Sequence, residues 1–161
     1  MTTRVLAIDP GYERLGVAVI EKQKNREQLL FSTCVITPRT LPFSERLLML
    51  GETVKKLIKE YQPTLVAIEK LFFTTNQKTA SAVSEVRGML LYLAALYHLP
   101  TTEFTPLQIK NTITGYGKAS KDQVTAMVRQ LVEIKTTPKH DDEYDAIAIG
   151  LTALAREKWI K

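Results

Sequence analysis

Hydrophobic residues in the first quarter of the chain occur in short continuous runs rather than at helical spacing. The runs cover residues 5–8, 16–20 and 29–36, and the turn-forming sequence Asp9-Pro10-Gly11 follows the first of them. Short apolar runs bounded by turn residues are typical of buried strands. Because only short polar segments separate these runs, we expect three strands that form an antiparallel meander.

The pattern changes to helical spacing after residue 42. Apolar residues recur every three or four positions over 43–61, and Pro63 ends that pattern. Thr105 with Pro106, and Ser120 with Gln123, have the chemistry of helix N-termini. Further along the chain we expect a strand over 65–68, a helix over 77–97, a strand over 101–104, helices that begin at 106 and 121, the second reaching about 134, and a last helix over about 141–157.

This order of elements predicts an α/β fold, with a mixed five-stranded sheet flanked by helices. The sequence contains no internal repeat, no linker and no low-complexity segment. We therefore expect residues 1–161 to form a single domain, a length that suits one hydrophobic core.

Composition narrows the setting in which the protein works. The 22 Lys and Arg residues exceed the 17 Asp and Glu residues, which gives a net charge of +5 and favours a polyanionic partner only slightly. Cys34 is the single cysteine, so a reducing compartment is expected. The longest apolar stretch, 89–97, is too short to span a bilayer, and no secretion signal precedes Asp9. We expect a cytoplasmic protein with no membrane partner.

Two carboxylates occupy equivalent positions in the expected sheet. Asp9 and Glu69 each follow a four-residue apolar strand. If these strands are parallel neighbours, both side chains emerge at one edge of the sheet, where functional sites of α/β folds gather. Asp9 alone is also explained by ordinary Asp-Pro-Gly turn chemistry, whereas Glu is not a favoured turn residue.

A second acidic group opens the last helix, where residues 141–145 read Asp-Asp-Glu-Tyr-Asp. The helix dipole explains acidic residues in the first turn, but Asp145 lies further in, beside residues expected in the core. Asp142 and Asp145 are three positions apart and share a face, so their charges repel. A bound cation would remove that repulsion.

Four converging carboxylates without His or Cys ligands indicate a hard cation, Mg²⁺ or alternatively Mn²⁺. The candidate metal ligands and catalytic residues are Asp9, Glu69, Asp142 and Asp145. Two such ions per site would activate a water and stabilise the leaving oxygen in phosphodiester cleavage.

Basic and aromatic residues lie close to these carboxylates in the sequence. Between Pro106 and Lys139 six positive charges face two negative ones, and Lys110, Lys118 and Lys121 belong to this stretch. The segment also holds the glycine-flanked loop 115–117, which can present backbone N–H groups to phosphate. A solvated helix surface is the other interpretation of such a charge run. Phe72, just after Glu69, is a candidate for stacking on a base, with core packing as the alternative.

Taken together, these motifs resemble the RuvC-type Holliday junction resolvases. They appear in the order and spacing of that family over nearly the whole chain. The matching residues are Ile8-Asp9-Pro10-Gly11 with Gly16, Val19 and Ile20; Ala67-Ile68-Glu69 with Phe72 and Asn76; Arg87-Gly88; Gln108-Ile109-Lys110; Gly115-Tyr116-Gly117 with Ser120, Lys121, Gln123 and Val124; and Asp142 with Asp145-Ala146-Ile147-Ala148-Ile149. The family's usual residues are replaced at Leu15, Val17, Ala18, Lys70, Ser84, Val86 and Tyr144, which suggests a divergent branch.

The resemblance implies an RNase H-like fold, a two-fold homodimer and Mg²⁺-dependent, paired nicking of four-way DNA junctions. It also implies that the four carboxylates bind the metal, that Lys110 and Lys121 contact DNA, and that Phe72 probes the junction. A branch-migration motor complex is a further candidate partner, which the sequence does not decide.

Three alternatives remain open at this point. An RNase H-like nuclease could act on another branched DNA or on RNA. A non-catalytic junction-binding protein would gain nothing from clustered negative charge near phosphate. Actin-like ATPases begin with a similar Asp-x-Gly strand and hairpin, but they need two lobes, and this chain has the length of one.

Overall fold

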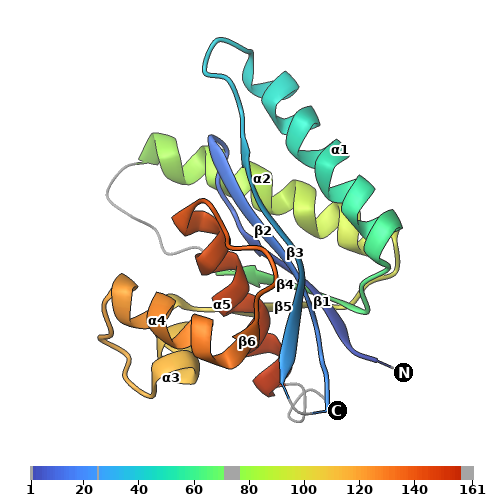
Figure 1. The fold of residues 1–161 in the computed structure, drawn as a ribbon. Helices are drawn as coiled ribbons and strands as arrows, with labels where there is room; N and C mark the ends of the chain where they lie inside the picture. The colour runs from blue at the N-terminus through green and yellow to red at the C-terminus, as the bar shows by residue number, and fades with distance from the viewer. Residues whose placement is uncertain (1, 25, 71–76, 157–161) are drawn as a thin grey trace.

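The computed structural model describes residues 2–24, 26–70 and 77–156, which form a mixed sheet covered by helices on both faces (Figure 1). The strand order is β5-β4-β1-β2-β3-β6. The strands are β1 (Arg4–Asp9), β2 (Arg14–Glu21), β3 (Glu27–Ile36), β4 (Leu65–Glu69), β5 (Thr101–Phe104) and β6 (Val132–Glu133). The expected meander is confirmed, because β1, β2 and β3 pair antiparallel, while β4 joins β1 and β5 joins β4 in parallel.

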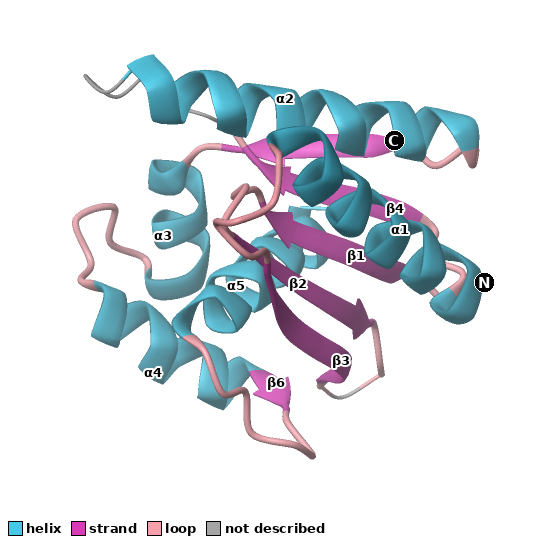
Figure 2. Ribbon diagram, turned by 90° about the horizontal axis from the view of Figure 1, so that it is seen from above, coloured by secondary structure: helices cyan, strands magenta, loops and turns pink. Residues whose placement is uncertain are grey.

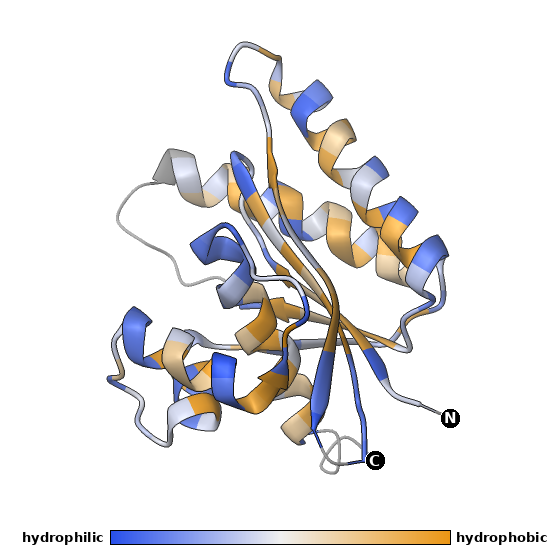
Figure 3. Ribbon diagram, viewed as in Figure 1, coloured by the Kyte–Doolittle hydropathy of each residue, from blue (hydrophilic) through white to orange (hydrophobic). Residues whose placement is uncertain are grey.

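The continuous apolar run of β1 is explained by burial on both faces. Val5 and Ala7 belong to one hydrophobic cluster, and Leu6 and Ile8 belong to the other. All four side chains are fully buried. In Figure 3 hydrophobic residues follow the middle of the strands, whereas the helices alternate hydrophobic and hydrophilic positions.

Two helices cover the face that carries Leu6 and Ile8. They are α1 (Phe43–Tyr61) and α2 (Gln77–Leu96), which lie beside each other on the same side of the sheet (Figure 2). Leu50 and Val54 of α1 and Leu90 of α2 reach the buried cluster. This is the helical periodicity that the sequence predicts for 43–61.

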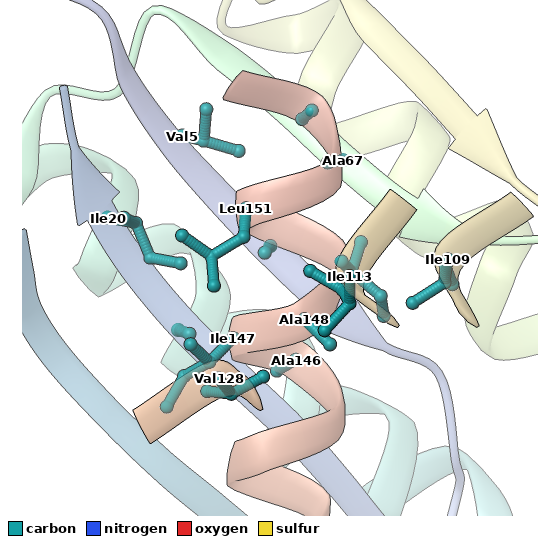
Figure 4. Close-up of a cluster of buried hydrophobic side chains, with 14 of the residues drawn as sticks. Val5, Ile20, Ala67, Ile109, Ile113, Val128, Ala146, Ile147, Ala148 and Leu151 are labelled. Carbon is teal, nitrogen blue, oxygen red and sulfur yellow. The ribbon is translucent and has the colours of Figure 1, made fainter. Parts of the chain in front are cut away.

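Three helices cover the opposite face: α3 (Pro106–Thr114), α4 (Lys121–Leu131) and α5 (Asp141–Arg156). Figure 4 shows Ile147 and Leu151 of α5 packed among strand and helix side chains. A Cβ atom at Gly150 would lie 2.6 Å from Ile20 Cδ1 and 3.1 Å from Ala7 Cβ. Glycine at this position therefore lets α5 lie directly against β1 and β2.

The helix starts at 106 and 121 are confirmed in detail. The Thr105 side chain accepts a hydrogen bond from the Gln108 N–H, and the Gln108 side chain accepts one from the Thr105 N–H. Ser120 and Gln123 form the same reciprocal capping box at α4. Each box satisfies two backbone donors that the helix leaves unpaired.

Two expectations need correction. The helix expected to reach residue 134 ends at Leu131, and Val132–Glu133 forms a sixth strand. The β-branched Val132 is buried and pairs in parallel with Glu27 of β3, so a long-range pairing overrides the helical pattern. The sheet has six strands rather than five.

Across the described residues, no helix combines the length and apolar character that crossing a membrane requires.

Candidate active site

The two strand-end carboxylates lie side by side, as the sequence predicts. Ile8 of β1 pairs with Ile68 of β4 in a parallel register, so Asp9 and Glu69 leave the same edge of the sheet. Their side chains share a hydrogen bond. Two carboxyl groups can be bonded in this way only while one of them carries a proton.

The electrostatics of this pair favour retention of that proton. Burial is the largest cause that raises the pKa of Asp9, followed by the negative charges of Glu69 and Asp145, and the pKa reaches about 8. Burial also raises the pKa of Glu69, although its bond with Asp9 and the charges of Lys110 and Lys121 oppose the shift. The edge of β1 and β4 is therefore a place where negative charge is poorly compensated.

The third and fourth carboxylates reach the same edge on helix α5. The first turn of α5 rests on β2 at Gly16, where an added Cβ would collide with the Asp142 carbonyl oxygen. Both Asp142 and Asp145 act electrostatically on Asp9. Asp145 has a raised pKa, mainly because of burial, and its bond with Lys121 opposes the shift. The structure thus gathers the four predicted carboxylates at one end of the sheet.

Glu143 lies between the two helix carboxylates in the sequence but serves another purpose. It is buried, with 4% of its surface exposed. Its carboxylate accepts hydrogen bonds from Ser32 Oγ at 2.5 Å and from the backbone N–H groups of Lys139 at 3.0 Å and His140 at 3.1 Å. Glu143 therefore fixes the start of α5, as a capping glutamate does. The Glu at the third helical position was the signal for this role, and the sequence interpretation missed it.

Each helix carboxylate is paired with a tethered cation. Arg14 Nη2 lies 2.6 Å from Asp142 Oδ2, and Lys121 Nζ lies 3.1 Å from Asp145 Oδ2. Lys121 also lies 3.9 Å from Asp141. The sequence pattern predicts Lys121 as a neighbour of the carboxylates, whereas the place of Arg14 beside Asp142 was not predicted. Its position at the start of the strand antiparallel to β1 was the available signal.

The donor set suits a hard cation, although the carboxylates are not arranged around one. Among the residues that the structure describes, no three Asp, Glu, His or Cys side chains form a ready-made ligand cluster. The carboxylate oxygens instead bind Arg14, Lys121 or one another. Oxygen donors with uncompensated charge fit Mg²⁺ or Mn²⁺ chemically. Asp9, Glu69, Asp142 and Asp145 are the side chains that could hold such an ion.

The other predicted site residues differ in their placement. Lys110 and Lys121 line a cavity of about 240 Å³ together with Glu69 and Asp145. Lys118 is exposed in the loop between α3 and α4. Phe72 lies outside the described residues, so its role in stacking stays a prediction.

The loop 115–117 is less open to phosphate than its glycines suggest. Gly115 has a left-handed φ of 75° and ends α3, with its N–H bonded to the Asn111 carbonyl oxygen. The N–H of Tyr116 donates to Thr114 Oγ1, and the N–H of Ala119 donates to the Tyr116 carbonyl oxygen. These three N–H groups already donate to acceptors in or next to the loop, so they are not available to bind a phosphate.

Comparison with known proteins agrees with the geometry. The profile of the family described as crossover junction endodeoxyribonuclease RuvC matches residues 5–153. A protein of that name from Desulfitobacterium hafniense is 46% identical over 147 residues, which cover 91% of this chain and 89% of that protein. The one from Thermosipho melanesiensis is 42% identical over 147 residues, 91% of this chain and 94% of that protein.

A solved structure extends the likeness to three dimensions. The structure described as T. thermophilus RuvC in complex with Holliday junction substrate superposes with a TM-score of 0.90 at 31% identity, covering 97% of this chain and 96% of that one. The expected RNase H-like fold is thereby confirmed. The chain belongs to the RuvC family of crossover junction endodeoxyribonucleases.

Proposed function

We propose that the protein resolves four-way DNA junctions by paired hydrolytic nicks, with Asp9, Glu69, Asp142 and Asp145 as its catalytic carboxylates. The observation that carries the proposal is the meeting of β1, β4 and the first turns of α5 at one edge, inside the fold of this nuclease family. A relative of 31% identity has been solved with a Holliday junction as its substrate.

The four carboxylates would hold Mg²⁺, two ions per site, and Mn²⁺ could take its place. When bound, such ions lower the pKa of a water that attacks the phosphodiester and stabilise the leaving oxygen. Asp9 must lose its proton before it can act as a ligand, because burial raises its pKa to about 8. Glu143 keeps the helix carboxylates in place through its bonds to Ser32 and the 139–140 backbone.

The lysines on the helix side of the cavity would hold the DNA backbone. Lys110 and Lys121 flank Glu69 and Asp145, and Lys118 extends the positive surface along the preceding loop. Carboxylates repel DNA, so cations beside them are needed to bring a phosphate close. Phe72, which follows Glu69 in the chain, would probe the base stacking at the junction.

We propose a homodimer as the working form, because a two-fold junction needs two symmetric cuts. The outer surfaces of α1 and α2 carry large exposed apolar side chains, Leu48 at 62%, Tyr92 at 65% and Leu96 at 52% exposure, which is the chemistry of a protein contact. A branch-migration motor complex would be a second partner, and retention of the motor subunits on the tagged protein would test that partner. The compartment would be the cytoplasm.

The test is cleavage of a synthetic four-way junction whose arms cannot migrate. We expect nicks at matching positions on two opposing strands with Mg²⁺, and no product with chelator. Asp9→Asn should reduce cutting more than about 100-fold while junction binding is retained, since neutral Asn is a poor ligand for a hard cation. Full cutting by Asp9→Asn would disprove the assignment of the site.

Substrate choice separates the main alternative from the proposal. The same protein should be offered a flap, a replication fork and an RNA–DNA hybrid at equal concentration. A preference for any of these over the four-way junction would support an RNase H-like nuclease of different substrate, and binding without any cutting would support a non-catalytic junction-binding protein.

A further inference from the structure

Arg14 lies beside the carboxylate cluster, at Asp142, and is not among the basic residues assigned to DNA above. It begins β2, directly after the turn that follows Asp9. Its guanidinium Nη2 lies 2.6 Å from Asp142 Oδ2 and 3.4 Å from His140 Nδ1. The side chain is 48% exposed, so it contacts the cluster on one side and solvent on the other.

This ion pair competes with any metal that uses Asp142. A guanidinium keeps its proton at every ordinary pH, so the pair cannot be dissolved by titration of Arg14. Asp142 Oδ2, the oxygen paired with Arg14, is not free for a cation, so a metal ion that uses this oxygen must displace Arg14. Half-exposed pairs of this type are weak, which makes the exchange feasible.

The acidic residue beside Arg14 in the sequence is already engaged by other arginines. The nearest acidic residue in the sequence, Glu13, already binds Arg39 at 2.7 Å and lies 4.0 Å from Arg46. The fork of a guanidinium matches the oxygens of a phosphate. At this edge of the sheet, the phosphate would be that of a DNA strand entering the site.

We propose that Arg14 exchanges partners during the reaction cycle. It binds Asp142 in the metal-free protein and a backbone phosphate of the junction once Asp142 binds metal. The inference rests on the proposed function and adds a positioning residue that links metal binding to DNA binding. Arg14 would discourage metal uptake before DNA arrives and strengthen DNA binding afterwards.

The matched variants are Arg14→Gln and Arg39→Gln. Both remove one exposed arginine charge and one ion pair near the same turn, but Arg39 binds Glu13 and has no contact with Asp142. Arg14→Lys keeps the positive charge without the fork. Thermal unfolding without metal identifies any variant that fails to fold.

Metal binding is measured first, without DNA, as the Mg²⁺ concentration that gives half of the maximal thermal shift. Removal of the competing cation should lower this midpoint about three- to fivefold in Arg14→Gln, which corresponds to the strength of an exposed ion pair. Arg39→Gln should keep the midpoint of the unchanged protein. An unaltered midpoint in Arg14→Gln would show that the ion pair does not compete with metal.

Junction binding is measured next, both in chelator and with Ca²⁺ before any nicked product forms. Arg14→Gln should weaken binding about three- to tenfold with Ca²⁺ and less than about twofold in chelator, and its salt dependence with Ca²⁺ should fall by about one contact per site. Arg14→Lys should recover part of the affinity. Equal weakening in both conditions would make Arg14 an ordinary phosphate contact and overturn the exchange.

These outcomes are independent of the test of the function. If the unchanged protein nicks the junction and Asp9→Asn does not, the nuclease stands whatever Arg14→Gln does. If no junction is cut at all, the Mg²⁺ midpoints still report whether Arg14 and metal compete for Asp142.

Discussion

The two halves of the acidic cluster cope with their negative charge by different means. Asp9 and Glu69, on neighbouring strands, share a hydrogen bond, and the pKa of each is raised mainly by burial. Asp142 and Asp145, on α5, each bind a cation tethered to the chain, Arg14 and Lys121. The strand pair is therefore neutralised in part by a proton, and the helix pair by side chains.

The difference follows from where each pair sits. The strand-end carboxylates are largely buried, and within the described residues no ion pair joins Asp9 to a basic side chain. The first turn of α5 lies nearer to solvent, where the long side chains of arginine and lysine can reach. A metal would replace a proton at Asp9 and Glu69, and it would replace the side chains of Arg14 and Lys121 at the α5 carboxylates. Mutation of the two halves should therefore change the stability of the protein without metal in opposite directions.

The largest effect is expected where the two halves are forced apart. Gly16→Ala places a methyl group against the Asp142 carbonyl oxygen and must shift the start of α5. Overpacking of this type costs about 1–3 kcal/mol of stability, and misplacement of catalytic groups by about 1 Å can cost roughly 100-fold in rate. Junction cleavage rates and urea unfolding measure both quantities.

Gly51→Ala on α1 is the control for that substitution, because its added Cβ would meet only the Met89 side chain, with Sδ at 3.4 Å and Cγ at 3.8 Å, which are ordinary contacts. It should cut junctions at the normal rate. If Gly16→Ala also cuts junctions at the normal rate, then the distance between the strand carboxylates and the α5 carboxylates is not critical for cleavage.

Stability without metal should reveal the contrast as a difference in sign. At pH 8, Asp9→Asn removes a buried charge and should stabilise the chelated protein by about 1–3 kcal/mol. Asp142→Asn breaks the pair with Arg14 and should destabilise it by less than about 1 kcal/mol. Chemical denaturation in chelator measures both. Shifts of the same sign would contradict the comparison.

The stabilisation that Asp9→Asn gives at pH 8 should become smaller at lower pH. The pKa of Asp9 is about 8 in the folded protein and 3.8 by default, so the folded state holds a proton that the unfolded chain releases between these values. The stability of the unchanged protein is therefore not reduced by Asp9 below about pH 4, where the carboxyl is protonated in both states. It falls as the pH rises to about 8, because the unfolded chain ionises first. We expect the gap between Asp9→Asn and the unchanged protein to shrink steadily from pH 8 to pH 5, and a constant gap would reject a shifted Asp9.

The smallest effect concerns the lysines. Lys121→Gln removes a cation that contacts Asp145 at 3.1 Å, whereas Lys118→Gln removes an exposed cation in the loop before α4. With metal present, we expect about three- to fivefold weaker junction binding for Lys121→Gln and a smaller loss for Lys118→Gln. Titrations at several salt concentrations measure the difference, and a larger loss for Lys118→Gln would place the DNA backbone further from the carboxylates.

Much of this arrangement was predictable from local patterns. The runs at 5–8 and 65–68 ended at Asp9 and Glu69, and strand-end position alone brought these residues together. The capping residues Thr105 and Ser120 located two helix starts correctly. Such features depend on neighbours in the sequence, which is why the sequence reveals them.

The remaining features depend on partners far away in the sequence. The strand Val132–Glu133 exists because β3 lies beside it, and the helical pattern before it gave no warning. The pairing of Arg14 with Asp142 joins positions 128 residues apart, and no periodicity reports such a contact. The raised pKa values of Asp9 and Glu69 likewise depend mainly on burial, which a strand-end position does not report.

The position of α5 in the chain, with its first turn against Gly16, has a consequence for the order in which the acidic cluster is assembled during synthesis. Two of the four carboxylates stand on this last helix, which follows every strand in chain order. A chain still emerging from the ribosome can fold its early strands first, but it carries only half of the acidic set until α5 has been made. Nascent chains would therefore be harmless to DNA, and a truncated product that lacks α5 would be a folded or misfolded protein without nuclease activity.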